Sequence, residues 1–171
     1  MNLRYLLSLL PSTHLCGTIQ EFRKSVFRET ADHTWRIMEP AIPLVWFTKE
    51  PHEEQFTQSL PLLNHELTVT EIATQENHVF YAIDSPENIE AFRTNVLPVP
   101  HKEGPWPLGP GLWLGREHTL SASKPHNVGT SQKNFLILHK IQYNDEITGV
   151  FWTELWRKPV FGNTARTIRP Q

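Results

Sequence analysis

Apolar side chains recur at helical spacing in two similar segments that lie seventy positions apart. Residues 19–26 and 89–96 share the pattern I-x-x-F-R-x-x-V. Apolar residues at positions i, i+3 and i+7 fall on one face of an α-helix, so each segment is predicted to form an amphipathic helix. The arginines of the two patterns, Arg23 and Arg93, sit one step off the apolar face. We expect both to be solvated or to snorkel at the edge of the core.

Start signals precede both predicted helices. Thr18 and Glu21 have the spacing of a capping box, in which each side chain caps a backbone amide of the first turn. Ser85 and Pro86 match an N-cap followed by a proline at the first helical position. The first helix is therefore predicted to begin near Thr18 and the second near Ser85.

Short segments rich in β-branched and aromatic residues predict a sheet. They are residues 44–48, 66–73, 78–83, 111–115, 134–141 and 148–156. Each predicted helix leads through a proline-containing stretch to a strand centred on a tryptophan, Trp46 in the first half and Trp113 in the second. Repeated units of this kind bury a face that neither could bury alone. We therefore predict an α+β fold, with two helices on a mostly antiparallel sheet.

The repeat also predicts the domain organisation. At 171 residues the chain is long enough for one domain with a sizeable core. We expect a single domain with two pseudo-repeats, about residues 12–77 and 78–158, and a short C-terminal tail, 159–171, that frays.

Composition narrows the functional classes. The formal net charge is −2 and the charges are scattered, so the chain has no basic stripe and nucleic acid is not an expected partner. The leucine-rich opening is cut short at Pro11, and no segment reaches the length of a membrane span. A single cysteine, Cys16, excludes an internal disulfide. We expect a cytoplasmic protein without membrane contact.

A proline-rich loop is the strongest candidate for an interaction surface. Residues 97–111 contain five prolines, which restrict the backbone and remove hydrogen-bond donors. Trp106 lies between two of them, where its indole is either a rigid anchor for a partner or a lid folded onto the core. Trp113 is the second aromatic candidate. Aromatic anchors dominate the energetics of interfaces, so a non-catalytic protein-interaction module is one reading of the chain.

Metal chemistry has little support in the sequence. The nine histidines form no H-x-x-x-H or H-E-x-x-H spacing, and no metal is predicted. One alternative remains open, in which His14, His78, Glu71 and Glu154 meet between the two halves. That set would resemble the vicinal-oxygen-chelate family, whose paired modules hold a metal with histidine and glutamate.

Nucleophilic chemistry is not indicated by a local motif. Cys16 follows His14 by two residues, without a marked acidic partner, and is interpreted as a buried, inert cysteine. No G-x-S-x-G elbow is present in the sequence.

Roughly the first fifty residues resemble ADP-ribosyltransferase-like folds. The resemblance rests on His14-Leu15-Cys16-Gly17-Thr18, followed by a helix and by Trp46-Phe47-Thr48. It implies an enzyme or effector that uses NAD. His14 and Thr18 would contact the nicotinamide ribose, Trp46 and Thr48 would line the nicotinamide site, and Glu154 would complete the catalytic site.

The three readings imply different partners. An ADP-ribosyltransferase would act on a protein target, an interaction module would bind a protein partner, and a vicinal-oxygen-chelate enzyme would use a metal. A protein partner or target is expected on two of the three. The sequence leaves the oligomeric state open.

Overall fold

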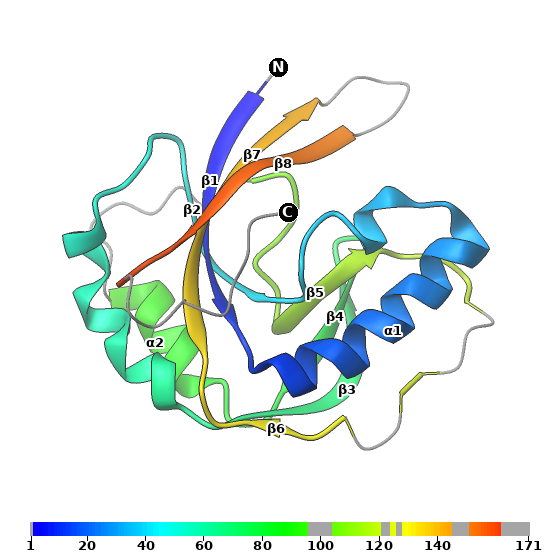
Figure 1. Cartoon of the computed structure of the whole chain (residues 1–171), viewed down its shortest axis with the longest axis horizontal. Coiled ribbons are helices and arrows are strands. Elements are labelled where there is room, and N and C mark those ends of the chain that lie inside the picture. Colours follow the sequence, from blue (N-terminus) through cyan, green and yellow to red (C-terminus); the bar gives the residue numbers. More distant parts are fainter. Residues whose placement is uncertain (1, 96–103, 121–123, 126–127, 145–150, 162–171) are drawn as a thin grey trace.

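The computed structural model describes residues 2–95, 104–120, 124–125, 128–144 and 151–161, which form two four-stranded antiparallel sheets (Figure 1). The first sheet has the order β2-β1-β7-β8, and the second has the order β5-β4-β3-β6. The strands of the first sheet are β1 (Asn2–Leu10), β2 (Ile42–Phe47), β7 (Phe135–Asn144) and β8 (Phe151–Pro159). Those of the second are β3 (Leu67–Gln75), β4 (His78–Ile83), β5 (Gly111–Arg116) and β6 (Thr130–Ser131).

Two α-helices, α1 (Thr13–Thr30) and α2 (Glu87–Asn95), cover the sheets. Each helix follows a strand of one sheet and lies over the other sheet: α1 lies over β3–β5 and α2 lies beside the first sheet (Figure 1). Two 3-10 helices, η1 (His33–Trp35) and η2 (Glu53–Asn64), complete the described elements. The predicted α+β class, with two helices and two similar halves, is confirmed.

The predicted helices form, with one difference at the start of α1. Phe22 and Phe92 are 4% and 3% exposed, and the isoleucines three positions before them are also buried. Val96 lies outside the described residues. Helix α1 begins at Thr13, five residues before the expected capping box, and Thr18 instead donates its hydroxyl to the carbonyl of His14 within the helix. The helix ends at Thr30, and the capping residue Ala31 adopts a left-handed conformation with φ of 55°.

The expectation that the arginines would be solvated or snorkel was wrong for Arg23, which is fully buried. Arg93 is partly buried, with 13% of its side chain exposed. Both side chains bind backbone carbonyls. Arg23 on α1 is fully buried and donates to the carbonyls of Leu114, Met38 and Thr34. Burial lowers the pKa of its guanidinium to about 9, so it stays charged at neutral pH. Arg23 needs no carboxylate partner, because backbone carbonyl oxygens accept hydrogen bonds from its guanidinium.

Arg93 makes the corresponding contacts from α2. It donates to the carbonyls of Gly109, Leu108 and Pro43, and Pro43 belongs to β2. Arg23 thus ties α1 to a strand of the second sheet, and Arg93 ties α2 to a strand of the first. The arginine at the same place in both repeats therefore links each helix to the sheet that it covers.

Five of the six predicted strands, which correspond to β2, β3, β4, β5 and β7, agree with the structure to within a few residues. Among these five, β4 agrees at both ends. The segment predicted at 148–156 corresponds to β8, but residues 148–150 lie outside the described residues. Strand β1 was not predicted. It lies between β2 and β7, and its last five residues are all buried, so its leucines do not alternate with polar residues. A continuous apolar run lacks the alternation of apolar and polar residues by which a strand is predicted from sequence.

Side chains from both sheets meet in a second core, which we call the tryptophan cluster. It comprises Leu6, Met38, Trp46, Phe80, Trp106, Trp113 and Ile141, with Trp152 packed against it. Trp106 stacks on Trp113 with ring centroids 3.9 Å apart and meets Trp46 edge-on at 4.9 Å. Gly104 approaches the ring of Trp46 so closely that a side chain there would collide with it. Part of the proline-rich segment therefore folds back between the sheets.

In the described part of the chain, no helix is long and apolar enough to cross a membrane.

Replacing Arg23 tests the importance of its buried contacts. Arg23→Met retains much of the apolar stem but leaves three buried carbonyls without their donor. We expect the free energy of unfolding to fall by at least about 3 kcal/mol, because each unsatisfied group costs about 1–3 kcal/mol. Urea denaturation measures the loss. Arg28→Met, at an exposed position on the same helix, is the matched control and should change stability by less than about 0.5 kcal/mol. Equal stability of the two variants would contradict the assignment.

Candidate functional site

A row of hydrogen-bonded side chains crosses three strands of the first sheet. Ser8 on β1 lies 2.6 Å from His139 on β7, measured from Oγ to Nε2. The other ring nitrogen of His139, Nδ1, lies 2.6 Å from the Glu154 carboxylate on β8. The side chains of the histidine and the glutamate are 3% and 8% exposed. We call these three residues the polar row.

The polar row shares a sheet face with part of the tryptophan cluster. Leu6 pairs directly with His139, and Ile141 pairs with Glu154, so these side chains stand on the same face. Ser8 lies two residues beyond Leu6 on that face. The row is therefore the polar continuation of the apolar contact between the two sheets.

The partners of His139 define where its proton lies. An ionised carboxylate only accepts, so Nδ1 must carry the hydrogen that faces Glu154. In the neutral imidazole, Nε2 is then an acceptor, and the hydroxyl of Ser8 donates to it. A hydroxyl, an imidazole and a carboxylate in this order can activate a serine.

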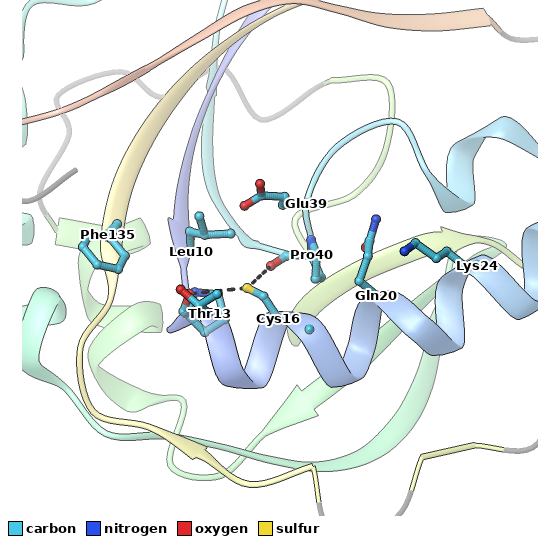
Figure 2. A pocket seen from close by; sticks show the side chains of 10 residues that line it. Leu10, Thr13, Cys16, Gln20, Lys24, Glu39, Pro40 and Phe135 are labelled. Carbon is cyan, nitrogen blue, oxygen red and sulfur yellow. Dashed lines mark hydrogen bonds between the residues drawn. The ribbon is translucent and has the colours of Figure 1, made fainter. Parts of the chain in front are cut away.

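An ion pair connects the region of the polar row to a pocket. Arg157 on β8 pairs across the sheet with His139, and its Nη2 lies 3.1 Å from Glu39. Glu39 in turn lines a pocket of about 340 Å³ beside the first turns of α1 (Figure 2). Leu10, two residues beyond Ser8 on the same strand face, lines it as well.

The pocket combines an apolar wall with a few polar groups. Figure 2 shows Leu10 and Phe135 on one side, Glu39 and Pro40 on another, and Gln20 and Lys24 along α1. The full lining is Leu10, Pro11, Thr13, Cys16, Gly17, Gln20, Lys24, Glu39, Pro40 and Phe135. A small number of polar groups in an apolar pocket of this size is typical of small-molecule sites.

Cys16 lines the pocket but is unsuited to nucleophilic attack. Its thiol lies within hydrogen-bond reach of the carbonyls of Pro11 and Pro40 (Figure 2). Burial, together with the nearby Glu39 carboxylate, raises the pKa of Cys16 to about 12. The thiolate is the reactive form, so the thiol is inert at neutral pH. This agrees with the interpretation made from the sequence.

His78 on the second sheet is held as a neutral acceptor. Trp113 donates its indole N–H to Nδ1 of His78 at 3.1 Å, and Trp152 stacks on the imidazole at 5.7 Å. Burial, aided by the positive charge of Arg116, lowers the pKa of His78 to about 4. The histidine therefore belongs to the packing between the sheets.

The structure does not bring together the residues suggested by the ADP-ribosyltransferase resemblance. His14 and Thr18 lie on helix α1, not on a strand, and His14 is exposed. Trp46 is fully buried in the tryptophan cluster and donates its indole N–H to the carbonyl of Trp106. Thr48 is exposed after the end of β2.

Glu154 contacts His139, a residue that the sequence did not single out. Among the residues that the structure describes, no hydrogen bond or ion pair joins Glu154 to His14 or Trp46. His139 and Ser8 were missed because they stand alone among leucines and isoleucines without a local motif. The usable signal was a polar side chain at an inward position of an apolar strand.

The two aromatic interaction candidates are buried. Trp106 and Trp113 are 2% and 1% exposed and face each other inside the tryptophan cluster. Of the two readings of Trp106, this placement matches the lid. The expected protein partner stays a prediction, as does the expectation of no nucleic-acid partner.

The vicinal-oxygen-chelate alternative finds no support. His14 lies on an exposed helix turn and Glu71 is exposed on β3, so neither joins His78 or Glu154. Within the described ranges, no three side chains of the metal-binding types are grouped in a way that could hold an ion.

Comparison with known proteins identifies the fold. No protein-family model matches the chain, and no curated protein matches it significantly in sequence. A crystal structure of E. coli LigT complexed with NADP+ superposes with a TM-score of 0.52 at 13% identity, over 94% of this chain and 99% of LigT. LigT in its apo form gives a TM-score of 0.51 at 14% identity, over 91% and 96% of the two chains. The chain thus has a LigT-like fold.

This fold overturns the functional reading that the sequence favoured. The resemblance to ADP-ribosyltransferase-like folds was wrong, and with it the proposed role of His14, Trp46 and Glu154 in ADP-ribose transfer. The resemblance placed residues 14–18 before the first helix. Those residues form the first turns of a long helix.

The lowered pKa of His78 predicts an acid-sensitive fold. In the unfolded chain the imidazole titrates near pH 6.5, whereas the folded state resists its protonation until about pH 4. The contribution of His78 to stability is therefore complete above pH 6.5 and is lost as the pH falls towards 4. Over that range we expect a loss of up to about 3 kcal/mol from this group.

Urea denaturation at several pH values measures this loss against His78→Gln. Glutamine keeps an acceptor for the indole N–H of Trp113 but does not titrate. The wild type should lose more stability on acidification than the variant. Parallel curves for the two proteins would show that another group is responsible.

Proposed function

We propose that this chain binds a small, phosphate-bearing nucleotide in the pocket beside α1. The observation that carries the proposal is the pocket itself, in which an apolar wall faces a lysine, a glutamine and a carboxylate. Such a set matches a ligand with a flat ring, hydroxyl groups and a negative charge. The LigT-like fold supports the nucleotide class, because LigT has been crystallised with NADP+.

Each part of a nucleotide has a suitable group in the pocket. Phe135, Pro40 and Leu10 offer apolar surface to a base. The Glu39 carboxylate accepts hydrogen bonds, which suits ribose hydroxyls. Lys24 supplies a positive charge for phosphate.

The start of α1 adds to the favourable field for an anion. No acidic residue occupies its first turn, and the preceding Ser12 makes no side-chain capping bond to the helix. The first-turn amides and the positive end of the helix dipole therefore favour a negative group near Thr13.

The volume of the pocket bears on the expected cofactor. At about 340 Å³ it lies at the lower end of ligand pockets, which range over about 300–1,000 Å³. A mononucleotide suits this size. NAD, the cofactor expected from the sequence, would place one of its two nucleotide halves inside and leave the other at the opening.

Gly17 gives a direct test of occupancy. A Cβ atom added there meets no other atom within 4 Å, and the residue lines the pocket. Because the backbone at Gly17 accepts a Cβ atom without a clash, Gly17→Phe should place a bulky ring at the pocket and abolish binding. Gly17→Ala should retain binding and stabilise the protein by about 0.5–1 kcal/mol, since alanine is the better helix former. Calorimetric titration with AMP and NADP+, beside adenosine, gives the affinities.

The proposal fails if neither AMP nor NADP+ binds the wild type at millimolar concentration, or if Gly17→Phe binds them equally well.

Lys24→Met tests the phosphate contact. We expect affinity for AMP to fall about fivefold, as for loss of one exposed charge contact worth about 1 kcal/mol, while adenosine is unaffected. Lys158→Met is the matched control, because the two lysine side chains are 56% and 52% exposed and each pairs with one glutamate. An equal effect of both variants would point to overall charge and away from this pocket.

A further inference from the structure

We propose that Ser8 is a catalytic nucleophile, activated by His139 and oriented through Glu154, and that it takes the phosphoryl group of a phosphoester bound in the adjacent pocket. The substrate class rests on the proposed function, whereas the reactivity of the serine rests on the polar row alone. Ser8, His139 and Glu154 are joined by two contacts of 2.6 Å.

The geometry meets the requirements for an activated serine. The nucleophile and the base lie within the hydrogen-bond range of about 2.6–3.2 Å, and the base is oriented by a third group. Glu154 only accepts, so it holds His139 in the tautomer whose free nitrogen faces Ser8.

The proposed reaction proceeds in two balanced steps. The Ser8 Oγ attacks phosphorus while its proton passes to Nε2 of His139, and the bond from phosphorus to the leaving oxygen breaks. The leaving alkoxide takes that proton from His139 and departs as an alcohol. Water, deprotonated by the same nitrogen, then attacks the phosphoserine, and phosphate leaves as Ser8 recovers its proton. Glu154 stays ionised throughout.

Ser8 has no direct opening to the pocket, and an apolar residue of the pocket lies beside it on β1. Ser8 is fully buried, and Leu10, the next residue on its strand face, lines the pocket. Leu10 packs with Cys16, Ala41 and Ile137 in a cluster separate from the main core. We infer that this cluster is the barrier between the pocket and the serine, so shortening Leu10 should open a path to Ser8.

A fluorophosphonate probe tests the serine without knowledge of the substrate. Diisopropyl fluorophosphate forms a bond from phosphorus to the serine oxygen and releases fluoride, and the serine proton leaves through the base. We expect one adduct, located on Ser8 by peptide mass spectrometry. Leu10→Ala should label at least tenfold faster than the wild type, and His139→Gln in the Leu10→Ala background should label at least tenfold slower than Leu10→Ala alone.

Glu154 is a positioning residue, and its test is rescue by the conservative variant. In the Leu10→Ala background, Glu154→Asp should retain a measurable part of the labelling, and Glu154→Gln should lose at least tenfold. Ser25→Ala, which removes an exposed hydroxyl on α1, should leave labelling unchanged. Circular dichroism and thermal denaturation confirm that each variant is folded at the labelling temperature.

The outcomes separate this inference from the proposed function. Absence of a Ser8 adduct in folded wild type and folded Leu10→Ala overturns the inference, even where AMP binds normally. Labelling of Ser8 that does not depend on His139 also overturns it. A His139-dependent adduct in a protein that binds no nucleotide supports the activated serine and removes only the assigned substrate class.

Discussion

The structure depends on two arginines, the buried Arg23 and the partly buried Arg93, that bind backbone carbonyls of the strands their helices cover. Arg23 and Arg93 occupy the same place in the repeated helix pattern, and each reaches a strand of the sheet that its helix covers. A guanidinium has five donors in a fixed fork, so one side chain can hold several carbonyls that would otherwise be unsatisfied. Without these arginines, backbone carbonyls where a helix, a strand and a loop meet would lack hydrogen-bond donors, and the fold would be less stable. This is why a position that looks solvated in a helical projection is part of the core.

The interlocking of the sheets decides what lies between them. Each helix follows a strand of one sheet and covers the other sheet. The sheet faces that the helices leave uncovered meet each other, and tryptophans from both halves fill the contact. The apolar contact is closed by stacking of Trp106 on Trp113. The polar row lies on the same face of the first sheet, next to this apolar contact. Its Ser8 and His139 are on the two central strands, β1 and β7. The pocket beside α1 adjoins that region.

The candidate site combines an open pocket with a closed polar row, and the two have different physical demands. The pocket needs only complementary surface, which Phe135 and Lys24 supply from different elements. A reactive serine needs a base held in one tautomer, and a buried carboxylate holds it better than an exposed one because competing water is excluded. The ion pair of Arg157 with Glu39 lies between the two regions. Binding and chemistry can therefore be separated by mutation.

The sequence by itself determined the local elements: two amphipathic helices, five of the strands and the duplication, because periodicity and turn residues report short-range structure. It also indicated the inert Cys16. It did not reveal β1, whose leucines lack a strand period, nor the burial of Arg23, whose carbonyl partners come from distant segments. His139 met Ser8 and Glu154 only in the folded sheet, since their separations of 131 and 15 residues are closed by strand pairing. Pairing between distant strands is a tertiary choice, and the site is its product.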